Sequence, residues 1–150
     1  GKALGGGLLP VSAAVGTKEV MDVFQPGDHG STFGGNPLGA AVAITALAVM
    51  ETEDFAGKSE RMGNLLMAKL HDLPFEQIVE IRGRGLLIGF EVDDSIDTYK
   101  LSGNLTKNGI LTKETRNKTF RLTPPLTITE DVIEDAVDRI DRAFRATLNR

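Results

Sequence analysis

The chain has 150 residues, of which 41% are hydrophobic, 5% are aromatic and none is cysteine, and its formal net charge is -4 at pH 7. The acidic balance and the lack of a basic stripe argue against nucleic acid or an anionic membrane as the main partner. The absence of cysteine excludes disulfide scaffolds, thiol catalysis and cysteine-ligated zinc, and with only two histidines we expect no metal site.

The sequence pattern predicts neither a targeting signal nor a membrane span. The longest apolar stretch, residues 38–50, falls far short of the roughly 20 residues that a membrane span needs. No charged-then-apolar signal segment opens the chain, and a protein without cysteine is typical of a reducing compartment, so we expect a cytoplasmic location and no membrane partner. The first residue is Gly1 rather than methionine, which indicates a processed chain or a piece of a longer one.

The first third of the chain is rich in loops, because ten of its 17 glycines fall within the first 39 residues. Here the pattern predicts a short strand at 11–15 and a short helix at 18–24. Asn36 followed by Pro37 is a helix start, and it opens a helix at 37–51. This helix is apolar nearly all round, which predicts burial between two layers.

The remainder alternates amphipathic helices with short strands. The elements that we expect there are helices at 54–73, at 98–108 and from Thr129 onward, and strands at 78–82, 86–92, 110–113 and 119–122. Such a pattern predicts helices on one face of a small, largely antiparallel sheet.

The change of pattern near residue 52 is the best candidate for a domain boundary. The pattern of residues 53–150 predicts a compact α+β domain. Residues 1–52 do not predict a domain by themselves, because one strand and one buried helix cannot close a core. We therefore expect this segment to need partner strands from outside the sequence.

The first candidate site residue is Lys2, which precedes a run of glycines in Gly1-Lys2-Ala3-Leu4-Gly5-Gly6-Gly7. Glycines let the backbone turn sharply and approach a ligand closely. A lysine held in that way, and desolvated, can act as an amine nucleophile that attacks a carbonyl. The alternative, a surface lysine in a flexible terminus, stays open on this heptapeptide alone.

A second candidate is the loop His29-Gly30-Ser31-Thr32-Phe33-Gly34-Gly35-Asn36-Pro37. Hydroxyl groups and free backbone amides just before a helix are what a phosphate dianion requires. The alternative is a simple turn, with Ser31 or Thr32 bonded locally and Asn36 capping the helix.

The third candidate is Arg121, a single cation in the apolar strand that ends at Pro124-Pro125. A planar guanidinium group suits a substrate carboxylate. A structural ion pair is the alternative for this residue.

Taken together, these segments resemble the C-terminal part of the class III aminotransferases, which depend on pyridoxal phosphate, and within that family the ornithine aminotransferases most of all. The likeness covers essentially the whole chain, and its matching segments occur in the family's order. These segments are 1–7, 10–13, 25–37, 82–87 and 120–126. The run Pro10-Val11-Ser12-Ala13 resembles the ornithine enzymes more than the acetylornithine or 4-aminobutyrate ones.

The resemblance implies an α/β protein of the pyridoxal-phosphate-dependent transferase fold type I. Residues 1–52 would be the end of the large, cofactor-binding domain with its connecting helix, and residues 53–150 the complete α+β C-terminal small domain. The cofactor would be pyridoxal 5'-phosphate. The reaction would transfer the δ-amino group of ornithine to 2-oxoglutarate, giving glutamate semialdehyde and glutamate.

The resemblance also implies a role for each candidate residue. Lys2 would be the catalytic lysine that forms a Schiff base with the cofactor and, once displaced, moves the proton between substrate and cofactor carbons. Thr32, with Ser31 beside it, would bind the cofactor phosphate across a dimer interface, and Arg121 would bind a carboxylate of 2-oxoglutarate or of the amino acid.

A complete enzyme of this family has a large domain that precedes the Schiff-base lysine, and that domain is absent from these 150 residues. We therefore expect the isolated chain to be inactive and to need an N-terminal half. The alternatives are an inactive remnant or excised small domain that acts as an interaction module, or another class III enzyme such as acetylornithine aminotransferase.

Overall fold

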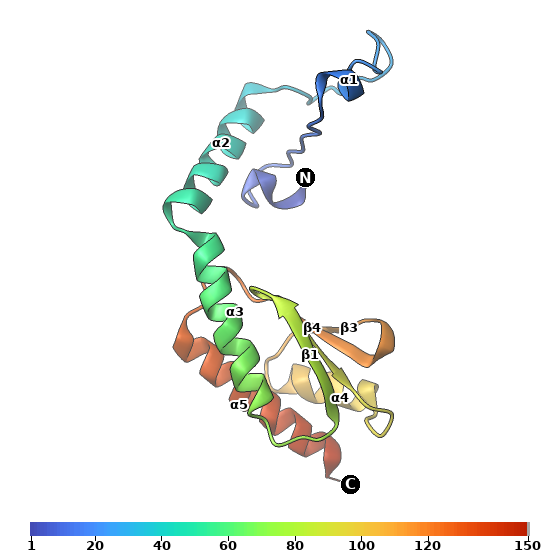
Figure 1. Ribbon diagram of the computed structural model, residues 1–150, viewed down its shortest axis with the longest axis vertical. Coiled ribbons are helices and arrows are strands. Elements are labelled where there is room, and N and C mark those ends of the chain that lie inside the picture. Colours follow the sequence, from blue (N-terminus) through green and yellow to red (C-terminus); the bar gives the residue numbers. More distant parts are fainter. Residues whose placement is uncertain (150) are drawn as a thin grey trace. The chain divides into compact units, whose positions relative to one another are not determined.

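The computed structural model describes residues 1–149, apart from the side chain of Asn117. The chain divides into two compact units, Gly1–Asp54 and a second unit that begins at Phe55. The first unit contains the 3-10 helix η1 (Lys2–Gly5), the short helix α1 (Lys18–Met21) and the long helix α2 (Pro37–Thr52), as Figure 1 shows.

The start of α2 confirms the helix signal in the sequence. The side chain of Asn36 caps the helix, since its Oδ1 accepts a hydrogen bond from the backbone N–H of Gly39 at 2.7 Å, and Pro37 occupies the first turn. The backbone N–H of Gly39, which has no carbonyl partner within the helix, thereby gains a hydrogen bond.

The strand predicted at 11–15 is wrong. Residues 11–15 carry no strand assignment, because a strand is defined by hydrogen bonds to a neighbour and the described strands all lie in the second unit. An apolar run of this kind becomes a strand only where a sheet is available to pair with it.

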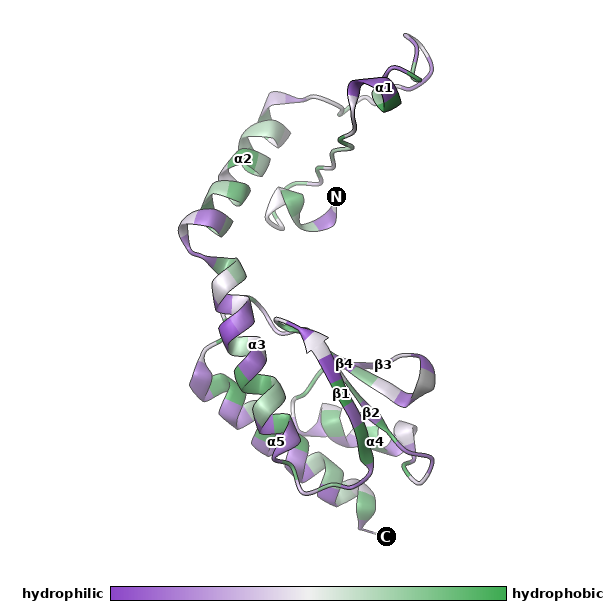
Figure 2. Cartoon of the chain, viewed as in Figure 1, coloured by the Kyte–Doolittle hydropathy of each residue, from purple (hydrophilic) through white to green (hydrophobic). Residues whose placement is uncertain are grey.

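The first unit has no hydrophobic core of its own. Within residues 1–54 only Gly5 and Gly39 are buried. The burial that we expected for α2 is not found within this unit, where Leu38 and Ile44 are 65% and 68% exposed. Figure 2 shows the same apolar character along much of α2.

The second unit is built on a four-stranded antiparallel sheet of order β1-β2-β4-β3. Its strands and helices are α3 (Phe55–His71), β1 (Ile78–Arg84), β2 (Leu87–Val92), α4 (Thr98–Lys107), β3 (Lys113–Glu114), the 3-10 helix η2 (Arg116–Lys118), β4 (Thr119–Leu122) and α5 (Glu130–Leu148). This confirms the expected α+β architecture, which Figure 1 shows.

The strand predicted at 110–113 exists but begins later than expected, since β3 comprises Lys113 and Glu114 and pairs with β4. The preceding residues complete the end of α4 instead. Gly109 has φ of 82°, and the N–H of Ile110 donates to the carbonyl of Leu105 at 2.9 Å. A left-handed glycine with such a return bond is a helix C-cap, which removes these residues from the ladder.

The core of the second unit lies between one face of the sheet and the three helices. Alternate residues of β2, namely Ile88, Phe90 and Val92, are buried on that face, as the sequence alternation predicted. The Phe90 ring stacks on Phe120 with centroids 5.3 Å apart and lies 5.8 Å from Phe144. The opposite face of the sheet therefore stays free of the helices.

A close contact joins α3 to the turn between β1 and β2. A Cβ atom on Gly63 would lie 2.1 Å from the carbonyl oxygen of Gly85, a distance that only glycine permits. The hydroxyl of Ser59, one turn earlier, accepts a hydrogen bond from the N–H of Leu86 at 3.1 Å. Two glycines and one hydroxyl thus fix the helix against the hairpin.

Candidate functional site

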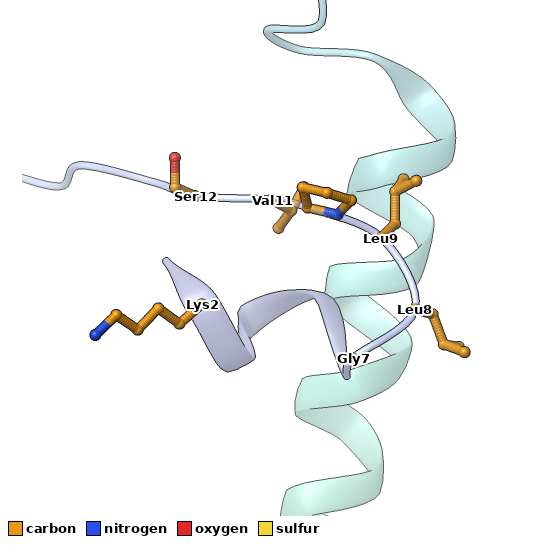
Figure 3. Close-up of a pocket in the computed structure, with 7 residues that line it drawn as sticks. Lys2, Gly7, Leu8, Leu9, Val11 and Ser12 are labelled. Carbon is orange, nitrogen blue, oxygen red and sulfur yellow. The ribbon is translucent and has the colours of Figure 1, made fainter.

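Lys2 lies in η1 with a backbone φ of 54°. This left-handed conformation is rare for a residue with a side chain and stores of order 1–3 kcal/mol of strain, which is most often found at functional sites. Gly6 and Gly7 have φ of 60° and 78°, so the chain turns directly after η1 ends. Figure 3 shows the Lys2 side chain extended away from η1.

A hollow of about 710 Å³ adjoins Lys2. It is lined by Lys2, Gly7, Leu8, Leu9, Pro10, Val11 and Ser12. The amine of Lys2 and the hydroxyl of Ser12 are its polar side-chain groups, and the other side chains are apolar (Figure 3). The Lys2 side chain is exposed, so its amine is accessible to a ligand.

The loop before α2 borders a second hollow, of about 310 Å³, and Ser31 is among its lining residues. The two hollows have residues 10–12 in common, and Lys2 lines the first of them while Ser31 lines the second. Thr32 is exposed and lines neither hollow.

The hydroxyls of Ser31 and Thr32 make no hydrogen bond to any residue within 1–149, so the local bonding considered as an alternative is not found. The loop is held by its backbone, since the N–H of Gly34 donates to the carbonyl of Ser31 at 3.2 Å. It leads directly into the N-terminus of α2, where the helix dipole favours negative charge. Both hydroxyls are therefore available to an anion.

Arg121 lies at the centre of β4, on the sheet face that the helices leave free. It is exposed, and it pairs with Gly89 of β2 on one side and with Lys113 of β3 on the other. No ion pair to Arg121 occurs among the described residues, so the structural ion pair considered for it is not found. Gly89 has no side chain of its own, and the methyl group of Thr119 lies against it, since a Cβ at Gly89 would meet Thr119 Cγ2 at 2.9 Å.

A polar cluster that sequence reasoning missed lies on the same face. Arg82 of β1 donates from Nη1 to Glu80 and, at 3.0 Å, to Glu91, and from Nη2 to the Thr119 hydroxyl at 3.0 Å. The hydrogen bond to Glu91 is the main reason that the pKa of Arg82 is raised above its usual range. Only the strand register, which spacing in the sequence does not reveal, brings these four residues together.

No helix in the described part of the chain is both long and apolar enough to cross a membrane. Residues 1–149 also contain no cluster of three or more histidine and acidic side chains arranged to hold a metal ion.

Comparison with known proteins matches residues 1–144 to the family model for class III aminotransferases. The chain is 49% identical over 144 residues to the ornithine aminotransferase of Staphylococcus carnosus and 46% identical over 147 residues to that of Brevibacillus brevis. Each alignment covers at least 96% of this chain and 36% of the relative, so the chain spans about a third of the length of these curated relatives.

Solved structures give the same result. The ornithine aminotransferase of Toxoplasma gondii matches with a TM-score of 0.88 and 47% identity, over 97% of this chain and 35% of that one. A second structure of the same enzyme reveals partial occupancy of PLP at its active site. The acetylornithine aminotransferase of Elizabethkingia anophelis matches with a TM-score of 0.84 and 41% identity, over 99% of this chain and 39% of that one. The chain belongs to the class III aminotransferases.

Proposed function

We infer that this chain supplies the C-terminal part of a pyridoxal-phosphate-dependent ornithine aminotransferase. The reaction is the transfer of an amino group from ornithine to 2-oxoglutarate, with glutamate semialdehyde and glutamate as products. The observation that carries the proposal is the left-handed Lys2, whose side chain extends beside a hollow lined by apolar residues. The relatives named as ornithine aminotransferases, with 45–49% identity, support the choice of substrate.

Lys2 is the residue that would hold the cofactor, as its Schiff-base lysine. Its primary amine is the group that condenses with an aldehyde, and the glycine run fixes the backbone that carries it. Once released, the same Nζ moves a proton to or from the substrate carbon that bears the amino group. Pyridoxal 5'-phosphate supplies an electron sink for that carbon when it is bound.

The loop that contains Ser31 and Thr32 would bind the phosphate group. Two hydroxyls without a partner in the described chain, followed by the N-terminus of α2, are a donor set suited to a dianion. Thr32, which is exposed and lines neither of these two hollows, fits a contact made across an interface with a second subunit.

Arg121 would bind a substrate carboxylate. Arg121 is exposed on the free face of the sheet, where it lies opposite Gly89. A planar fork of N–H donors binds a carboxylate through two parallel hydrogen bonds, which fixes the orientation of the substrate as well as holding it.

The remaining part of such an enzyme must come from residues other than these 150, because the chain spans 36% of its relatives. An N-terminal portion, in the same polypeptide or as a separate chain, would supply it and cover the exposed apolar surface of α2. We use the term complete enzyme for residues 1–150 together with that portion, and propose that it works as a cytoplasmic homodimer.

The experiment is to assemble the complete enzyme with pyridoxal 5'-phosphate and to measure both the absorbance of the lysine-bound cofactor and the formation of glutamate from 2-oxoglutarate. Ornithine and N-acetylornithine are compared as amino donors. Activity with ornithine and a cofactor band support the proposal. Preference for N-acetylornithine would shift the assignment to the acetylornithine enzymes, and no cofactor band would contradict the proposal.

A matched pair of variants controls this experiment. Lys2→Ala should abolish the cofactor band. Lys18→Ala removes another exposed lysine of the first unit, one that pairs with Asp22 on the surface of α1, and should leave the band intact. A cofactor band that survives in Lys2→Ala would refute the role of Lys2.

A further inference from the structure

A row of residues crosses the free face of the sheet through Arg121. In strand order it consists of Arg82 on β1, Gly89 on β2, Arg121 on β4 and Lys113 on β3, each directly opposite the next. Directly opposed residues of antiparallel strands project from the same face, with Cβ atoms about 4.5–5.5 Å apart. Three cationic side chains thus share one row.

The charges in this row are compensated at one end only. Arg82 is held by the carboxylates of Glu80 and Glu91. By contrast, Arg121 and Lys113 face one another, and within residues 1–149 neither forms an ion pair with an acidic side chain. The only nearby carboxylate on the facing strand, that of Glu91, already accepts hydrogen bonds from Arg82 and Thr119.

Two like charges directly opposite each other destabilise a pair of strands. Such a pair is stabilised when an anion lies between the two side chains. Arg121 and Lys113 are both exposed, so a ligand can reach them from solvent. The pair therefore has the charge, the donors and the access that a carboxylate ligand requires.

We propose that Lys113 is a second carboxylate-binding residue, which acts with Arg121 and makes the site select the dianionic 2-oxo acid over ornithine. This rests on the proposed function. 2-Oxoglutarate carries two carboxylates, whereas ornithine carries two amino groups and one carboxylate and is a net cation near neutral pH. Two adjacent cations attract the former and repel the latter.

The test is the Lys113→Gln variant of the complete enzyme. Loss of one hydrogen bond between charged groups should raise KM for 2-oxoglutarate about tenfold. KM for ornithine should stay the same or fall. Lys113→Arg, which keeps the charge, should retain KM for 2-oxoglutarate near the starting value. Lys107→Gln is the matched control, because it removes an exposed lysine at the end of α4 in the same unit.

A binding measurement separates this proposal from the proposed function. In thermal unfolding of the complete enzyme, 2-oxoglutarate should raise Tm, and Lys113→Gln should reduce that rise without lowering the Tm of the ligand-free protein. Both Tm results are expected even if the enzyme fails to use ornithine. Failure to use ornithine would refute the proposed function but leave the role of Lys113 standing. Equal KM values and equal Tm shifts in Lys113→Gln and Lys107→Gln would overturn the role of Lys113.

Discussion

The contact between α3 and the β1–β2 turn leads to a sharp prediction for Gly63→Ala. In most helix interiors this change stabilises a protein, because alanine is favoured over glycine by about 1 kcal/mol. Here the added Cβ would meet the carbonyl oxygen of Gly85 at 2.1 Å and its carbonyl carbon at 2.3 Å. Both atoms belong to the backbone, so no rotation of a side chain can relieve the overlap.

The helix and the hairpin must therefore separate by more than 1 Å to restore ordinary contact, which begins at about 3.4 Å. Overpacking of this kind costs up to about 3 kcal/mol. The separation also breaks the hydrogen bond from the N–H of Leu86 to Ser59, which is worth about 1 kcal/mol. After the gain in helix propensity, we expect a net loss of about 3 kcal/mol in the free energy of unfolding.

Thermal and urea unfolding of the 150-residue chain, followed by circular dichroism, measure this loss. For a unit of this size it corresponds to a fall in Tm of roughly 10–20 °C. Gly103→Ala in α4 is the control, because a Cβ there meets nothing within 4 Å, and it should raise Tm by several degrees. If Gly63→Ala also raised Tm, the close packing of α3 on the hairpin would be refuted.

Three further predictions concern the core, a helix cap and an acidic side chain. Phe144→Ala removes a fully buried ring that contacts Phe90 and should lower the free energy of urea unfolding by about 3–5 kcal/mol; a loss below about 1 kcal/mol would contradict the packing. Asn36→Ala removes the cap of α2, worth about 1 kcal/mol, and should speed hydrogen exchange in its first turn about fivefold, whereas unchanged exchange would count against the cap. The hydrogen bonds from Ser95 lower the pKa of Asp93 below its ordinary 3.8, so its stabilising contribution is present above that value and is lost as pH falls through the lower, folded pKa. Asp93→Asn should accordingly destabilise the chain in urea at neutral pH and have no effect in strong acid; an equal effect at both would exclude the mechanism.

Local patterns in the sequence were sufficient for much of the fold. The pair Asn36-Pro37 predicted the start of α2, and the alternation through Ile88 and Phe90 predicted the buried face of β2, because both signals arise from neighbouring residues. The missing strand at 11–15 and the late start of β3 have a shared reason. Whether an apolar run pairs as a strand depends on a partner elsewhere, which neither 11–15 nor 110–112 has in the described chain.

The candidate site divides in the same way. Lys2, Ser31 and Arg121 belong to short motifs, so the sequence alone could single them out. Lys113 and the Arg82 cluster could not be found in that way, because they depend on the register that sets β1, β2, β4 and β3 side by side. Spacing along the chain does not show which residues face each other across β2, β4 and β3, because β2 and β4 are separated in the sequence by α4 and β3.

The proposed function depends most directly on a bond between Lys2 and the cofactor. The decisive measurement is to treat the complete enzyme, loaded with pyridoxal 5'-phosphate, with borohydride, which reduces a lysine Schiff base to a stable link, and to map the modified peptide by mass spectrometry. We expect a phosphopyridoxyl group on Lys2 and on no other lysine of this chain. A modified lysine elsewhere in the loaded enzyme, with Lys2 unmodified, would contradict it.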